Sequence, residues 1–202
     1  MNTLLQSVRP ALSLFVVMTA LTGVAYPLLV TGIAQAAFPH ASNGSIVTVD
    51  GQAVGSTFVG QSFTAPRYFW SRPSATGPMP NNGGGSGGSN FGANNPALAD
   101  AVKGRIDVLH AADPAQKKAV PIDLVTASGS GLDPDISLAA ALYQMPRVAR
   151  ARGLPQQAVQ DLIDAQARVP WLGVVGEPRV NVLALNLALD GKAAGTTTMP
   201  AR

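Results

Sequence analysis

Cysteine is absent from this 202-residue chain, which contains two histidines and a single glutamate. Without cysteine, neither a disulfide framework nor a thiolate metal site can form. The two histidines, His40 and His110, are too few to build the usual zinc sites alone. The lone Glu177 excludes the pair of glutamates that many glycoside hydrolases use.

Charge is also scarce, because Asp, Glu, Lys and Arg make up 12% of the chain and the formal net charge is +3. The basic residues form no run, and aromatic residues do not interleave with them, so the sequence argues against nucleic-acid binding. A domain with so few charges is expected to have part of its surface covered by another molecule.

Residues 10–38 contain no charged residue and no histidine, and fifteen of the twenty residues from 11 to 30 are apolar. A helix of that length spans about 30 Å, which is the thickness of the hydrocarbon layer of a bilayer. We therefore expect a cytoplasmic N-terminus at residues 1–9, one transmembrane helix at residues 10–34 and a periplasmic domain at residues 35–202.

The orientation of this helix follows from its flanking charges. Arg9 precedes the apolar run, the next Lys or Arg is Arg67, and cytoplasmic flanks retain basic residues. A cleavable secretory signal is the rival interpretation, because Ala34-Gln35-Ala36 has the small-x-small form of a cleavage site. The apolar run exceeds the roughly 7 to 15 residues of a signal core, which favours an uncleaved anchor. Both alternatives export the rest of the chain.

A proline lies inside the expected membrane helix. Pro27 has no N–H group, so the carbonyl of Gly23 loses its helical partner. Thr19, Thr22, Gly23 and Tyr26 share one face, and small or hydroxyl side chains let another helix approach closely. This face is expected to contact a partner's helices. Alternatively, glycine and proline are simply tolerated in a single anchor.

The exported part reads as one mixed α+β domain without an internal repeat. Short strands are expected within 45–63, around an Asp50-Gly51 turn, and a polar loop is expected from 80 to 96. The remaining expected elements are a helix from Pro96 to Ala112 capped by Asn95, a strand at 122–126, a helix opened by Asp133-Pro134 and interrupted or restarted at Pro146, and a helix from Pro155. Residues 180–189 fit either a strand or a helix capped by Asn181, and we favour the helix.

Consecutive aromatic residues Tyr68, Phe69 and Trp70 stand between Arg67 and Arg72. They could form a recognition surface for a partner. They could equally form a strand with one ring buried and two half-covered.

Two glycine-rich stretches match patterns that carry chemistry in other proteins. Residues 83–88 match the dinucleotide pattern G-x-G-x-x-G, but the strand before it and the helix directly after it are missing. Residues 84–88 match G-x-S-x-G, but nothing places a histidine near Ser86. No P-loop lysine follows a glycine-rich loop. The residues alone therefore predict a membrane-tethered domain without visible catalytic machinery, and an anchored exported enzyme is left as an alternative.

Several short motifs then occur in a telling order along nearly the whole chain. They are Arg9-Pro10-Ala11-Leu12, Tyr26-Pro27-Leu28, Tyr68-Phe69-Trp70-Ser71-Arg72-Pro73-Ser74-Ala75, Ser86-Gly87-Gly88-Ser89-Asn90, the run from Val125 to Asp133, Pro146-Arg147-Val148-Ala149 and Asn186-Leu187-Ala188-Leu189. Together they resemble the C subunit of the Kdp potassium-transporting ATPase.

This resemblance implies a non-catalytic, single-pass subunit of the bacterial inner membrane. Its partners would be a channel-like potassium-translocating subunit, a P-type ATPase subunit, a small single-span subunit and membrane lipid. The family's C subunit is described as a catalytic chaperone that raises the affinity of the ATPase subunit for ATP. No cofactor would be bound firmly, and ATP would act through the partner ATPase subunit. The alternative is a membrane-anchored periplasmic binding or sensor module unrelated to transport.

The resemblance also directs attention to particular residues. Ser128, Gly129, Ser130, Gly131 and Gln144 are the positions to test for a nucleotide-related role. Thr19, Gly23, Pro27, Tyr68, Trp70 and Arg72 are the candidates for partner contacts.

One physical difficulty concerns the glycine- and serine-rich loop at 128–131. Its backbone N–H groups could cradle a phosphate. The expected topology, however, puts this loop outside the cell, while ATP is inside. Any effect on ATP affinity is therefore expected to be conformational, a coupling between separate sites.

Overall fold

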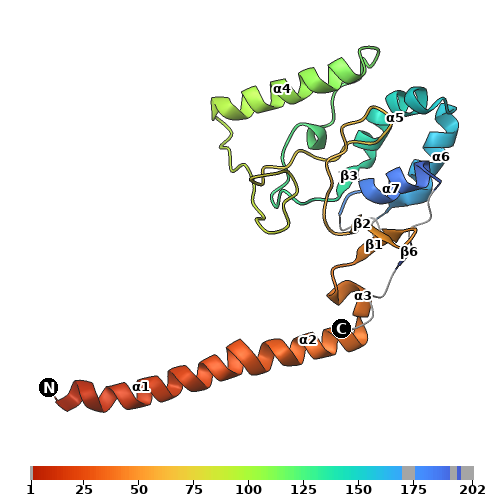
Figure 1. Ribbon diagram of the computed structural model, residues 1–202. Coiled ribbons are helices and arrows are strands. Elements are labelled where there is room, and N and C mark those ends of the chain that lie inside the picture. The colour runs from red at the N-terminus through yellow and green to blue at the C-terminus, as the bar shows by residue number, and fades with distance from the viewer. Residues whose placement is uncertain (1, 170–175, 192–194, 197–202) are drawn as a thin grey trace. The chain divides into compact units, whose positions relative to one another are not determined.

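The computed structural model describes residues 2–169, 176–191 and 195–196 (Figure 1). The chain forms two compact units, one that ends at Ser45 and one that spans Ile46–Thr196. We call the second unit the C-terminal domain and describe each unit by itself. An N-terminal apolar helix followed by a small α+β domain is the predicted fold class, which is confirmed.

The first unit is mostly one long helix, which ends before Phe38, followed by a short helix. Helix α1 (Asn2–Ala20) continues through a π-helical turn, η1 (Leu21–Ala25), into α2 (Tyr26–Ala37), and α3 (Pro39–Ser42) follows. Ser7–Ala37 is long and apolar enough to cross a membrane, and none of its most apolar window is buried. It is the one helix with these properties in the part of the chain that the structure describes. Its length and composition match a single-pass anchor.

The π-helical turn lies directly before Pro27. The N–H of Tyr26 bonds to the carbonyl of Leu21, and the hydroxyl of Thr22 donates to the carbonyl of Met18 at 2.7 Å. Since Pro27 cannot donate a helical hydrogen bond, the helix widens in the turn before it. The local disturbance that the sequence predicts at this proline is therefore present.

The C-terminal domain begins with a β-hairpin. Strands β1 (Ile46–Val49) and β2 (Gln52–Ser56) are antiparallel, and β6 (Gly195–Thr196) pairs with the other edge of β1. The turn residues Asp50 and Gly51 both have positive φ angles, of 52° and 78°, as a tight hairpin turn requires. This confirms the hairpin expected within 45–63.

An irregular stretch follows, and then helix α4 (Pro96–Ala112). The side chain of Asn95 accepts a hydrogen bond from the N–H of Ala97 at 3.0 Å, so the predicted cap and the predicted polar loop are both confirmed. In Figure 1, α4 runs along one side of the domain, apart from the group formed by α5, α6 and α7.

The strand predicted at 122–126 is wrong. Residues Ile122–Leu124 form a 3₁₀ turn, η2, because the N–H groups of Leu124 and Val125 bond to the carbonyls of Pro121 and Ile122, three residues earlier. Adjacent Leu124 and Val125 are both buried, which a strand with alternating faces does not allow.

The helix predicted to open at Asp133-Pro134 begins later. Strand β3 (Asp135–Ser137) intervenes because it pairs with β5 (Arg179–Asn181), and β4 (Ala167–Arg168) pairs with the other edge of β5. Helix α5 (Leu138–Arg152) then starts after Ser137, whose hydroxyl accepts from the N–H of Ala140 at 3.0 Å.

The predicted break at Pro146 is also wrong, since α5 continues through it and ends at Gly153, which has a left-handed conformation. Helix α6 (Gln156–Gln166) follows Pro155 as expected. The ambiguous segment forms the favoured helix, α7 (Val182–Leu189), and Asn181 caps it by accepting from the N–H of Ala184 at 3.0 Å.

Two apolar clusters share α7. The larger cluster lies among α5, α6, α7 and the sheet formed by β3, β5 and β4, and it includes Val182 and Leu185. The smaller cluster lies under the hairpin and includes Leu183 and Leu187. Because α7 carries apolar residues on both of these flanks, the sequence of residues 180–189 fits both a strand and a helix.

Candidate interface and nucleotide-related residues

Residues 66–72, which we call the clamped segment, are held by buried amide side chains. The amide of Gln144 accepts from the N–H of Trp70 at 2.8 Å and donates to its carbonyl at 3.1 Å. The amide of Asn186 accepts from the N–H of Phe69 at 2.9 Å and donates to its carbonyl at 3.0 Å. Both amides are 1% exposed, so each replaces the pairing that a neighbouring strand would provide. Helices α5 and α7 thus fix the backbone of this segment.

Arg147 extends the same network one turn along α5. Its guanidinium donates to two carbonyl groups of the clamped segment, including that of Tyr68 at 3.1 Å, and to Gln144 at 2.8 Å. It also lies 4.4 Å from the centroid of the Trp70 ring, as in a cation–π contact. Burial lowers the pKa of Arg147 to about 10, against the opposing effect of Asp113. Arg147 therefore stays charged at neutral pH.

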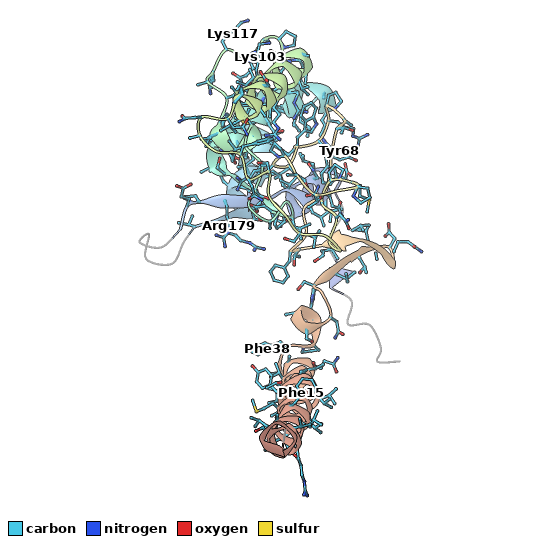
Figure 2. The ribbon with its side chains drawn as sticks, turned by 90° about the vertical axis from the view of Figure 1, so that its left-hand side faces the viewer. Phe15, Phe38, Tyr68, Lys103, Lys117 and Arg179 are labelled. Carbon is cyan, nitrogen blue, oxygen red and sulfur yellow. The ribbon has the colours of Figure 1, made fainter. Side chains whose placement is uncertain are left out.

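A second cluster anchors the start of the clamped segment. Asp190, just after α7, accepts from the hydroxyl of Tyr68 at 2.9 Å and forms ion pairs with Arg152 at 2.8 Å and Arg67 at 3.3 Å. Burial raises the pKa of Asp190. The hydrogen bonds from Arg152 and Tyr68 and the positive charges of Arg152 and Arg67 together lower the pKa by more than burial raises it, so the net shift is downward. Figure 2 labels Tyr68 on the C-terminal domain.

The aromatic run is irregular in structure, although its burial matches one of the two interpretations. Phe69 is fully buried, while Tyr68 and Trp70 are half-buried. Arg72 is half-buried as well and pairs with Asp133 at 2.9 Å. A role of Tyr68, Trp70 and Arg72 in partner contacts stays a prediction, and the same holds for Thr19, Gly23 and Pro27 on the membrane helix.

The loop at 128–131 packs against the residues that follow the clamped segment. The N–H of Ser128 donates to the carbonyl of Pro73 at 3.3 Å, and the hydroxyl of Ser74 donates to the carbonyl of Gly131 at 2.7 Å. The N–H of Gly131 bonds back to the carbonyl of Ser128 at 3.3 Å. Ser128 is buried, whereas Gly129 and Ser130 are exposed.

Gly131 is the residue of this loop whose backbone requires glycine. Its φ is +68°, and an added Cβ would lie 2.6 Å from a methyl carbon of Thr76. The loop and Gln144 thus bond to different parts of one stretch of chain, Gln144 to Trp70 and the loop to Pro73 and Ser74. Their nucleotide-related role stays a prediction.

Comparison with known proteins identifies the family. The family described as "K+-transporting ATPase, c chain" (KdpC) matches residues 8–191. The chain belongs to the KdpC family. It is 64% identical over 182 residues to the potassium-transporting ATPase KdpC subunit of Polaromonas naphthalenivorans, which covers 90% of this chain and 93% of that protein. The KdpC subunit of Sorangium cellulosum is 61% identical over 188 residues, or 93% of this chain and 99% of that protein.

Sequence reasoning missed several residues that hold the site of this KdpC chain. The sequence assigns no role to Arg147 and Asn186, which lie within the family motifs, or to Arg152 and Asp190. A polar residue inside an apolar run, such as Asn186 between Leu185 and Leu187, is a usable signal, because a buried amide must find hydrogen-bond partners. The identity of those partners depends on the fold.

The described residues of this KdpC chain contain no group of three or more His, Asp or Glu that could hold a metal ion. The titratable groups of the site are instead used in structural pairs, as for Asp190 and Arg152. What the arrangement does is to fix the shape of a surface segment with side chains from helices far away in sequence.

Proposed function

We propose that this chain is an accessory subunit of an ATP-driven, high-affinity potassium uptake complex in a bacterial inner membrane. Its partners are a channel-like potassium-translocating subunit, a P-type ATPase subunit and a small single-span subunit. The observation that carries the proposal is the family match over residues 8–191, with relatives named as potassium-transporting ATPase subunits that it covers almost completely.

In this proposal the chain stabilises the assembly from two sides. The membrane helix contacts partner helices through the face with Thr19, Gly23 and Pro27, next to the π-helical turn Leu21–Ala25. The C-terminal domain lies on the periplasmic side, over the outer mouth of the potassium-translocating subunit. Support comes from the clamped segment, since buried amides hold its shape before any partner binds, and a preordered surface loses less entropy on association.

We further propose that the chain raises the ATP affinity of the ATPase subunit through conformational coupling. The amide of Gln144 is already bonded to Trp70 and Arg147, and the N–H groups of Ser128 and Gly131 are bonded within the domain. A loop on the periplasmic side would also be separated from cytoplasmic ATP by the membrane. An indirect effect between distant sites needs no contact with the nucleotide.

A truncated complex tests this role. In complexes lacking residues 40–202 of this chain, we expect the apparent affinity for ATP to fall by about 5-fold or more, the lower end of ordinary coupling between sites. The measurement is the ATP dependence of potassium-stimulated ATPase activity, together with potassium uptake. Unchanged ATP affinity and unchanged uptake would rule out a regulatory role of the C-terminal domain.

A further inference from the structure

A groove lies between α4 on one side and residues 62–64 and 70–73 on the other. Its volume is about 380 Å³, and its walls include Phe63, Trp70, Gly104, Arg105 and Val108. A largely apolar wall with few polar groups is typical of a binding site of this size. No role has been given to this groove so far, and we call it the α4 groove.

The charge of the α4 groove is positive and partly uncompensated. Arg72, on one wall, is paired with Asp133 at 2.9 Å. Arg105, on another, donates to the carbonyl of Val125 at 2.6 Å, and in the described part of the chain it has no carboxylate within ion-pair distance. Arg105 is half-buried, and this burial lowers its pKa. Asp100 supplies a single carboxylate at the wall.

Gly104 leaves room in the groove. A Cβ at this position would meet no atom within 4 Å, so glycine is not needed here for packing. Glycine in the middle of a helix is less favourable than alanine. Position 104 of α4 therefore keeps open a space that an ordinary helical residue would partly fill.

We propose that the α4 groove binds a polypeptide segment of another subunit of the same complex, one that carries an apolar side chain beside a carboxylate. The apolar side chain enters between Trp70 and Val108, and the carboxylate pairs with Arg105. Charge complementarity selects an acidic segment, because half-buried Arg105 has no ion-pair partner among the described residues. The groove volume fits one or two side chains, not the paired acyl chains of a membrane lipid. This inference rests on the function proposed above.

Photo-crosslinking in the intact complex tests the occupant. A photoreactive benzoylphenylalanine replaces Val108, which is 58% exposed on the groove wall, and in a control it replaces Lys117 on the loop after α4 (Figure 2). We expect position 108 to crosslink to a peptide of another subunit that contains Asp or Glu, with about tenfold the yield of position 117. A crosslink to lipid alone, to a peptide without Asp or Glu, or to nothing overturns the proposal.

Two variants, measured with the probe at position 108, add independent evidence. Gly104→Leu fills the groove, whereas Gly104→Ala adds one carbon in open space and serves as the control. Arg105→Gln removes the charge. We expect Gly104→Leu and Arg105→Gln each to lower the crosslinking yield about tenfold, a loss typical of a central interface residue. Near-normal yield in both variants overturns the proposal.

The result also separates this proposal from the function on which it rests. If no potassium-transport subunit co-purifies with the unmodified tagged chain in mild detergent, the proposed function fails. If the complex is recovered intact and the groove gives no crosslink to a subunit, the inference about the groove alone fails.

Discussion

At the scale of single residues, the amides of Gln144 and Asn186 explain how a segment without strand pairing can be ordered. Each amide offers one donor and one acceptor to the backbone C=O and N–H of a single residue, Trp70 for Gln144 and Phe69 for Asn186. Since the amides are buried, removal of either would leave polar backbone groups without partners away from water.

Gln144→Ala and Asn186→Ala should therefore be destabilising. We expect each to lower the free energy of unfolding by about 2–4 kcal/mol, since a buried polar group left unsatisfied adds to the lost hydrogen bonds. Gln157→Ala is the control, because among the described residues the Gln157 side chain bonds to exposed Asp161 on the same helix alone, and its loss should lower the free energy of unfolding by less than about 0.5 kcal/mol. Denaturant unfolding followed by tryptophan fluorescence measures both. An unchanged stability of Gln144→Ala would contradict the clamping role.

Asp190 should make stability depend on acid pH. Its pKa is lower in the folded state than in the unfolded state, so its contribution is complete well above the unfolded value of about 3.9 and is lost as pH falls through the folded value. The gap in unfolding free energy between the native chain and Asp190→Asn should thus be largest near neutral pH and shrink below about pH 4. Denaturation curves from pH 3 to pH 7 measure this gap, and a constant gap would show that the ion pairs contribute nothing.

At the scale of secondary structure, the sequence predicts correctly those features that depend on neighbouring residues, namely helix caps and a hairpin turn. The caps Asn95 and Asn181 and the Asp50-Gly51 turn act within a few residues of themselves, and all three were recognisable in the sequence. The misassigned 133–137 region becomes strand β3 because it pairs with β5 more than forty residues later. The neighbours of such a strand are not visible from its own residues.

The candidate site divides in the same way. Tyr68, Trp70, Arg72 and Gln144 were selected from the sequence, yet Gln144 meets Trp70 across a separation of 74 residues. A contact of that range depends on how α5 packs against the core, which residue spacing does not encode. The sequence therefore does not reveal which of these residues bond to one another, and their functional roles stay predictions.

Two glycines test the backbone requirements of these elements. Gly104→Ala in α4 should raise the free energy of unfolding by about 0.5–1 kcal/mol, because the helix gains a better helix former and the new methyl meets nothing. Gly131→Ala should lower it by about 1–3 kcal/mol, because of its φ of +68° and the crowding by Thr76. Thermal unfolding compares the two variants directly. The opposite order would show that the loop at 128–131 can relax.

At the scale of the whole molecule, the topology of the anchor decides what the C-terminal domain can reach. Ser7–Ala37 can span a bilayer, and Arg9 favours a cytoplasmic N-terminus. Protease added to intact spheroplasts should then digest the C-terminal domain while a cytoplasmic marker protein survives. Protection of the domain until lysis would place it on the cytoplasmic side, and direct contact with ATP would become possible.

The packing of α7 against both apolar clusters has a further consequence. Leu183 and Leu187 pack under the hairpin, while Val182 and Leu185 belong to the larger apolar cluster with residues of α5 and α6. Unfolding of either cluster would therefore expose apolar residues of α7 to water. A calorimeter should accordingly record one cooperative heat-absorption peak for this domain rather than two, with equal calorimetric and van't Hoff enthalpies.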